Sequence, residues 1–231
     1  LQLVSQLTGH GDDPLPLYDT LDELPYPAHD LRRRLDFVVI NTSRGCPMRC
    51  TYCASHLLHP RGFRQRNPYA VVEEIGYWHT GYGVQDIVFY DDALLIHSQR
   101  HFHVILDEIL RQKLPCRFHT PNGLHARLIA PQLAEKMFAA GFKTVRMSLE
   151  TVSRSRRQET GPKVTEEDVR QAIAYLKGVG FAGHDIGVYV LMGLPDQPLQ
   201  EVMDSINYVH DCGARVSVSY THLTLPTNRE V

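Results

Sequence analysis

The chain has 231 residues and a mass of 26.3 kDa, which is enough for one large domain or two small ones with a full core. Its hydrophobic fraction of 43% and charged fraction of 22% exclude a disordered, collagen-like or coiled-coil chain. The formal net charge of −2 excludes a broad cationic field for nucleic acid or anionic lipid. No apolar run approaches the roughly 20 residues of a membrane-spanning helix, so we expect a soluble protein.

The first part of the chain differs in pattern from the rest. Residues 1–35 are rich in proline and acidic residues without sustained periodicity, which predicts a linker or arm. Short β-branched or apolar runs, typical of strands, follow from residue 36 onward. The expected strands are 37–40, 87–90, 117–119, 144–149, 186–191 and 214–216.

Helical patterns separate these strands. Apolar residues recur at helical spacing within 71–78, 102–110, 133–138, 169–176 and 199–206. Asn67, Pro131 and Thr165 are expected at helix starts. Because strict alternation of strand and helix requires crossover connections, the fold class is α/β with a parallel sheet, either an open doubly wound sheet or most of a barrel. In both, ligands bind at the carboxyl ends of the strands.

Three cysteines follow the first strand. Cys46, Cys50 and Cys53 lie within eight residues on a loop expected at this ligand-binding edge. Soft sulfur donors select iron–sulfur, zinc or copper, and closed structural sites usually use four protein ligands. Cys116 and Cys212 precede strands and are expected at the opposite edge, where they cannot complete the site. A 4Fe-4S cluster held by three thiolates would keep one iron open for another ligand. The alternatives are three buried cysteines or a zinc site completed by His56 or His59.

The spacing Cys46-x3-Cys50-x2-Cys53, with Tyr52 before the last cysteine and a strand before the first, resembles the radical S-adenosylmethionine (radical SAM) superfamily over residues 36–216. The resemblance implies a partial (β/α)6 TIM-like barrel with parallel strands and an incomplete sixth strand. It also implies that the open iron binds S-adenosylmethionine, whose reductive cleavage gives methionine and a 5'-deoxyadenosyl radical.

The resemblance extends to other strand ends. Asp91 and Asp92 stand where the family often has a Gly-Gly-Glu-like segment, so this sequence departs from that pattern; the Asp-Asp form resembles the cobalamin-associated branch. The resemblance implies contacts with S-adenosylmethionine for both aspartates and for six further residues. These are Tyr52, Asn122, Ser148, Glu150, Lys163 and Gly193. Alternation along the fourth strand would place Ser148 and Glu150 on one side.

We expect the native protein to be truncated at both ends of this chain. Residues 21–31 resemble the connector that follows a cobalamin-binding domain, so cobalamin is expected as a cofactor only of a longer parent protein. Residues 217–231 resemble a non-native tail, which would end the native sequence near Val216. The expected domains are therefore a linker at 1–35, a radical SAM core at 36–216 and a tail.

Two further groups of basic residues carry no predicted role. His97, His101 and His103 flank a helix start and are expected at the surface. The short arginine runs 32–34 and 154–157 are expected to be solvated faces, with contact to a phosphate of a larger substrate as the alternative.

The predicted function is a radical SAM enzyme core that belongs to a cobalamin-dependent methyltransferase or ring-forming enzyme. The alternatives are a nucleic-acid-modifying radical enzyme and, from another class, a non-catalytic zinc or iron–sulfur module. S-adenosylmethionine and an external electron donor are the expected partners, whereas membranes and nucleic acid are not. The thiols and the lack of an export signal predict a cytoplasmic location.

Overall fold

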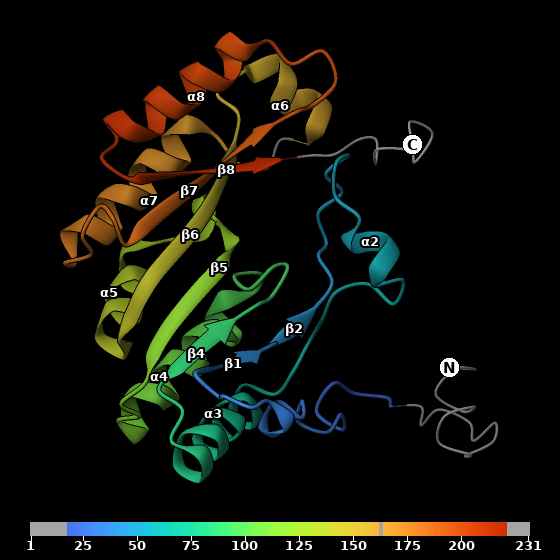
Figure 1. Cartoon of the computed structure of the whole chain (residues 1–231), viewed down its shortest axis with the longest axis vertical. Helices are drawn as coiled ribbons and strands as arrows, with labels where there is room; N and C mark the ends of the chain where they lie inside the picture. Colours follow the sequence, from blue (N-terminus) through green and yellow to red (C-terminus); the bar gives the residue numbers. More distant parts are fainter. Residues whose placement is uncertain (1–17, 162–163, 221–231) are drawn as a thin grey trace.

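The computed structural model describes residues 18–161 and 164–220. A six-stranded, wholly parallel sheet in the order β1-β4-β5-β6-β7-β8 forms its centre (Figure 1). No pairing joins β1 to β8 within the described residues, so the barrel is partial, as predicted. The strands are β1 (Phe37–Ile40), β4 (Asp86–Phe89), β5 (Arg117–His125), β6 (Phe142–Glu150), β7 (Ile186–Met192) and β8 (Arg215–Tyr220).

Helices connect the strands and lie mainly along one face of the sheet, while the carboxyl ends of the strands point toward the side where α2 lies (Figure 1). The long helices are α3 (Pro68–Tyr82), α4 (Phe102–Gln112), α5 (Pro131–Ala140), α7 (Glu166–Gly178) and α8 (Leu199–Asp211). The shorter elements are α2 (Ser55–Leu58), α6 (Arg154–Thr160), the antiparallel pair β2 (Ser43–Arg44) and β3 (Arg64–Gln65), and the 3-10 turns η1 (His29–Leu31), η2 (Ser98–Arg100) and η3 (Ala126–Leu128). Among the described helices none is long and apolar enough to cross a bilayer.

The predicted helix starts are confirmed. The Asn67 side chain accepts a hydrogen bond from the Tyr69 amide at 2.9 Å and precedes a proline at the first helical position. Pro131 occupies the equivalent position of α5. Thr165 and Asp168 form a reciprocal capping box that starts α7. These local contacts fix where each crossover helix begins.

Aromatic residues join the sheet to α4. The rings of Phe89, Phe118 and Phe142 stack with centroid separations of 5.3 to 5.9 Å, and the Phe102 ring of α4 meets Phe89 and Phe142 edge-on. All four side chains are almost completely buried. Burial of each contributes roughly 1.5–3 kcal/mol, so this cluster anchors strands β4 to β6, whose carboxyl ends carry predicted site residues.

The edge strand β1 is covered by the segment that precedes it. His29 Nε2 lies 3.1 Å from the Val39 carbonyl oxygen, and Arg32 donates to the Phe37 carbonyl at 3.1 Å. Leu21 is buried, and Asp22 accepts a hydrogen bond from the Asn67 amide at 2.8 Å. The described part of the expected linker therefore protects the open edge of the sheet.

At the other edge, β8 continues to Tyr220, four residues beyond the expected native end at Val216. It stays in register with β7 up to the pair Met192 and Tyr220. The non-native origin of the tail stays a prediction, and residues 221–231 lie outside the described part of the chain.

Two of the three histidines expected at the surface are buried, which corrects that expectation. His97 is exposed, but His101 and His103 are nearly inaccessible. The His101 ring lies 3.1 Å from the Arg66 carbonyl, and burial lowers the pKa of both buried imidazoles. A polar ring can occupy such a position because a neighbouring segment supplies a hydrogen-bond partner.

Candidate functional site

The three cysteines lie on one loop, residues 45–54, which we call the Cys loop. It runs from β2 to α2 beyond the carboxyl ends of the strands (Figure 1). Gly45 begins it at φ 81°, and a Cβ there would lie 2.7 Å from the Gly62 carbonyl oxygen, so only glycine fits. The Thr51 amide donates to the Thr160 carbonyl at 3.1 Å. The loop is therefore attached to the end of α6.

The donor set of this loop fits a metal cluster. None of the five cysteines forms a disulfide, and three thiols share eight residues. Gly161 lies beside Cys50, since a Cβ added there would make an ordinary contact 3.8 Å from the sulfur. Within the described residues, no three His, Cys, Asp or Glu side chains already form a metal-binding group. Cluster ligation by Cys46, Cys50 and Cys53 therefore stays a prediction that requires the thiols to converge.

Asp91, directly after β4, fixes the chain segment that leads into the Cys loop. Its buried carboxylate accepts hydrogen bonds from the Thr42 amide at 3.0 Å, the Thr42 hydroxyl at 2.9 Å and the Ser43 hydroxyl at 2.5 Å. Burial raises its pKa to about 6, against the lowering effect of these hydrogen bonds. Asp91 thus holds β1 to β4 where the loop begins.

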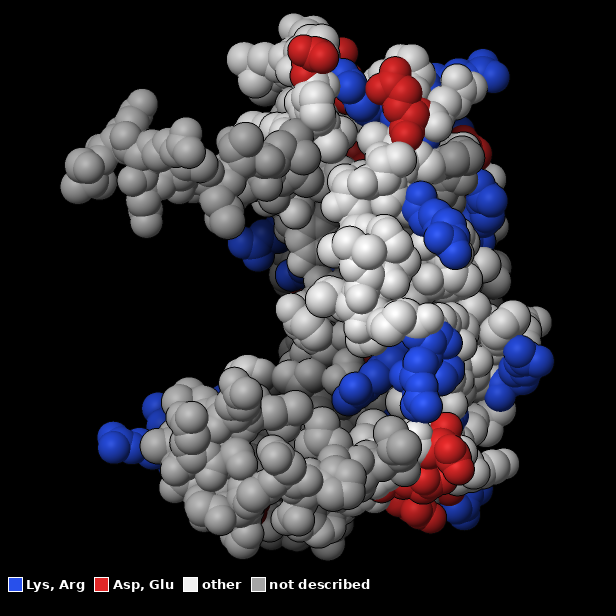
Figure 2. Space-filling view, turned by 90° about the vertical axis from the view of Figure 1, so that its right-hand side faces the viewer, with Lys and Arg blue, Asp and Glu red and all other residues white. Residues whose placement is uncertain are grey.

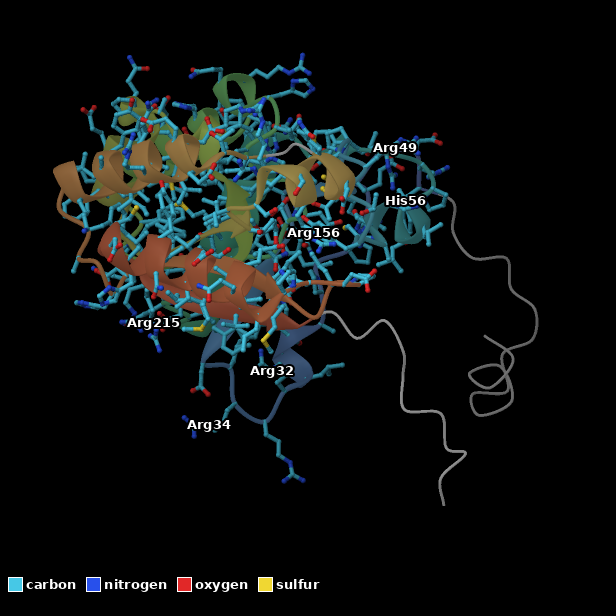
Figure 3. All side chains as sticks on the ribbon, turned by 90° about the horizontal axis from the view of Figure 1, so that it is seen from above. Arg32, Arg34, Arg49, His56, Arg156 and Arg215 are labelled. Carbon is cyan, nitrogen blue, oxygen red and sulfur yellow. The ribbon has the colours of Figure 1, made fainter. Side chains whose placement is uncertain are left out.

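Asp92 contacts the other end of the loop. Its carboxylate accepts a hydrogen bond from the Ser55 hydroxyl at 2.7 Å and lies 3.5 Å from His59 Nε2. Because both adjacent carboxylates contact the protein itself, their predicted contact with a ligand ammonium stays a prediction. His56 is exposed on α2, and Figure 3 shows it near Arg49 of the Cys loop, away from Arg215 at the start of β8.

Tyr52 connects the Cys loop to the end of β6. Burial raises the pKa of its hydroxyl, and so do the nearby Glu150 carboxylate and the Cys50 thiol, which both interact with that hydroxyl. Glu150 adopts φ 70°, which is rare for a non-glycine residue. The structure therefore brings Tyr52 and Glu150 together with one predicted cluster ligand.

Ser148 and Glu150 have different surroundings, although alternation predicted one side for both. The pairing of β6 with β7 is irregular between these two residues, which interrupts the alternation. Ser148 is buried against Gly123, whose added Cβ would lie 2.1 Å from the Ser148 hydroxyl oxygen. Asn122 donates to the carbonyls of Tyr90 and Asp91, both at 3.2 Å. Asn122 and Ser148 therefore pack strand ends together, and their predicted ligand contacts remain untested.

The turn after β7, residues 193–198, is organised by a residue that sequence reasoning missed. Gln197 Oε1 accepts hydrogen bonds from the Gly193 amide at 3.0 Å and the Leu194 amide at 3.3 Å. Its Nε2 donates to the Leu191 carbonyl and to Glu201, both at 3.1 Å. Gly193 adopts φ 91°. The only sequence signal is a glutamine four residues after a turn glycine, which alone is not specific.

Arg156 and Arg157, expected on a solvated face, have largely buried side chains, only 16% and 13% exposed. The Arg156 guanidinium donates to the Pro195 carbonyl at 2.9 Å and to the Asp196 carbonyl at 3.0 Å. Figure 3 shows Arg156 nearer the centre of the molecule than Arg49 and His56. The expectation fails because backbone carbonyls about forty residues further along supply the partners of this cation.

A cleft of about 340 Å³ lies where these parts meet. Tyr52 of the Cys loop, Arg156 and Glu159 of α6, and Leu194 and Pro195 of the β7–α8 turn line it. It combines an aromatic ring of the Cys loop with a guanidinium and the β7–α8 turn. Lys163, the remaining predicted contact, lies outside the described residues.

The charged side chains around the carboxyl edge are mixed in sign. Figure 2, viewed from the right-hand side of Figure 1, shows separate Lys and Arg patches across the middle of this face, with Asp and Glu toward its top and lower part.

An open parallel α/β sheet with a thiol-bearing loop at its carboxyl edge defines a cofactor-dependent enzyme core. The family model described as Radical SAM superfamily matches residues 40–227, and the chain belongs to this superfamily of enzymes. Members of the superfamily use a 4Fe-4S cluster and S-adenosylmethionine, the two cofactors expected from the sequence.

Curated relatives carry methyltransferase names. An uncharacterized methyltransferase of Pyrococcus horikoshii is 27% identical over 224 residues, 94% of this chain and 47% of that protein. Cytidylyl-2-hydroxyethylphosphonate methyltransferase of Streptomyces wedmorensis is 23% identical over 226 residues, 89% of this chain and 42% of that protein. The chain thus spans less than half the length of these relatives.

Solved structures share the fold. The radical S-adenosylmethionine methyltransferase TsrM of Kitasatospora setae, solved with cobalamin and a 4Fe-4S cluster bound, superposes with a TM-score of 0.67 at 19% identity, covering 79% of this chain and 36% of that chain. The cobalamin-dependent radical enzyme OxsB gives a TM-score of 0.61 at 16% identity, covering 74% and 26%. At these identities the likeness concerns the fold.

Proposed function

We propose that the chain is the S-adenosylmethionine-cleaving core of a cobalamin-dependent radical methyltransferase. The observation that carries this proposal is the position of the three-thiol loop. It lies at the carboxyl edge of a partial parallel barrel, beside a cleft lined by Tyr52 and the turn that follows Gly193. Ligands of α/β barrels gather at this edge.

In this proposal Cys46, Cys50 and Cys53 would hold a 4Fe-4S cluster. When bound, the cluster would supply the one-electron reduction that cleaves S-adenosylmethionine to methionine and a 5'-deoxyadenosyl radical. The chain's own residues bind and orient the nucleotide. Tyr52 and the Gly193 turn frame the adenine. Ser148 and Glu150, with Asp91 or Asp92, are proposed to orient the remainder of the nucleotide.

Transfer of a methyl group is proposed from the names of the relatives. Two curated relatives are called methyltransferases, and two structural neighbours are described with cobalamin. Cobalamin and the substrate would be bound by parts of a longer protein, because the chain covers less than half of those relatives. An external donor would supply the electron, and a reducing cytoplasm would preserve the thiols.

The test is an anaerobic assay of the reconstituted chain with S-adenosylmethionine and dithionite. We expect 5'-deoxyadenosine and methionine in equal amounts, and their loss in a Cys50→Ala variant. Cys212→Ala is the matched control, because Cys212 lies before β8 and should leave cleavage unchanged. Equal product formation by the Cys50→Ala variant and the wild type would refute the proposed role of the Cys loop.

A further inference from the structure

A hydrogen-bonded chain links the end of β4 to one predicted cluster ligand. The Ser55 hydroxyl donates to Asp92 Oδ2 at 2.7 Å, and the Ser55 amide donates to Cys53 Sγ at 3.5 Å. Ser55 is buried, whereas the Asp92 side chain is 37% exposed. One serine therefore contacts a sheet carboxylate through its side chain and a thiol through its backbone.

The two ends of this chain of contacts differ in rigidity. Asp92 follows β4, whose Phe89 belongs to the buried aromatic cluster, and its neighbour Asp91 is held by hydrogen bonds. The helix that begins at Ser55, α2, has only four residues, so it is too short to be stable without contacts to the rest of the protein. The position of Ser55 is therefore set from the sheet.

We propose that Asp92 is a positioning residue that places Cys53 through Ser55. This inference rests on the proposed function, in which Cys53 holds the cluster. Hydrogen bonds to cysteine sulfurs are one of the factors that set the reduction potential of an iron–sulfur cluster, and loss of an outer partner commonly weakens metal binding 10- to 100-fold. Asp92 would thus affect both retention of the cluster and its potential.

Four variants separate this role from general destabilisation. Ser55→Ala and Asp92→Ala remove the hydrogen bond from opposite ends. Asp92→Asn keeps an acceptor oxygen while it removes the charge, so it should restore the contact. Asp107→Ala is the matched control, because Asp107 is an exposed carboxylate on α4 that forms one ion pair, with Lys136.

The first measurement uses the unloaded chain and does not depend on a cluster. We expect hydrogen–deuterium exchange in residues 53–59 to become about fivefold faster in Ser55→Ala and Asp92→Ala, the change expected for one lost hydrogen bond. Exchange should stay at the wild-type rate in Asp92→Asn and Asp107→Ala. Unchanged exchange in both alanine variants, or equal acceleration throughout the chain, would overturn the proposal.

The second measurement uses the chain reconstituted with iron and sulfide. In Ser55→Ala, loss of iron to a chelator should be about tenfold faster. The midpoint potential should become more negative, because the amide of residue 55 that donates to Cys53 Sγ is no longer held in place by the hydroxyl contact with Asp92. Wild-type iron loss and potential in this variant would overturn the role of Asp92 toward the cluster. A wild-type chain that binds no iron would instead refute the proposed function, and the exchange data would still decide whether Asp92 positions Cys53.

Discussion

Ser148 of β6 lies directly over Gly123 of β5, where a Cβ would stand 2.1 Å from the serine hydroxyl oxygen and 3.2 Å from the serine backbone nitrogen. Because the backbone atom cannot move aside, Gly123→Ala should destabilise the fold by about 1–3 kcal/mol. Urea unfolding of the two proteins measures this difference. Gly76→Ala is the matched control: Gly76 lies in α3 with open space around it, so this change should stabilise by about 0.5–1 kcal/mol. An unchanged midpoint for Gly123→Ala would show that the close approach is absent.

The buried carboxyl of Asp91 predicts a specific dependence of stability on pH. Its pKa is about 6 in the folded chain, against about 4 when unfolded. Between these values the folded chain retains a proton that the unfolded chain releases, so the stabilisation is complete below pH 4 and lost as the pH rises through 6. The difference is on the order of 3 kcal/mol, since one pKa unit corresponds to about 1.4 kcal/mol.

Asp91→Asn should remove this dependence. Urea unfolding of both proteins at pH 4, 5, 6 and 7 gives the free-energy difference between them at each pH. Between pH 4 and pH 7 we expect the wild type to lose a few kcal/mol of stability relative to Asp91→Asn. A difference that is constant across this range would contradict the raised pKa of Asp91.

Arg156 should stabilise the turn that lines the cleft. Arg156→Ala removes two hydrogen bonds to the carbonyls of Pro195 and Asp196 and leaves those acceptors without the cation, which should cost about 2–4 kcal/mol. Arg156→Lys should recover less than half, because an ammonium lacks the planar fork that reaches both oxygens. Thermal unfolding measures the loss of stability in both variants. Arg154→Ala is the control: Arg154 is exposed, so this change should cost less than about 0.5 kcal/mol. Equal effects of the alanine changes at 154 and 156 would contradict this role.

Gln197 should be required as an amide in the same turn. Gln197→Glu keeps the acceptor for the Gly193 amide but loses the donor to the Leu191 carbonyl and places a second carboxylate beside Glu201. We expect destabilisation by about 1–3 kcal/mol at pH 7.5, partly relieved at pH 5 as the new carboxyl gains a proton. Differential scanning calorimetry at both pH values is the test. A variant as stable as the wild type at pH 7.5 would exclude the donor role of the amide.

The sequence predicted the local and alternating features of the fold well. Asn67 and Thr165 mark helix starts because a capping side chain acts within three residues. The parallel direction of the strands followed from the crossover rule, whereas the barrel-like order was implied only by the family resemblance. The extension of β5 was missed, because Pro121 and Gly123 indicate a break. The strand nevertheless continues past them with an irregular register.

The site was predictable only where its signal is local in sequence. The Cys loop is a short motif after a strand, and the family match agrees with it. Arg156 and Gln197 could not be predicted, because the arginine binds carbonyls in a distant segment and the glutamine folds back on its own turn. The conformation of Glu150, at φ 70°, likewise depends on the pairing of β6 with β7.

The most direct test of the central claim is the iron and sulfide content of the anaerobically reconstituted chain, together with its electron paramagnetic resonance spectrum when reduced. The proposal predicts about four irons and four sulfides per chain, and a spectrum that changes when S-adenosylmethionine is added, because one iron remains open to the nucleotide. One zinc ion per chain, or a cluster whose spectrum is indifferent to S-adenosylmethionine, would contradict it.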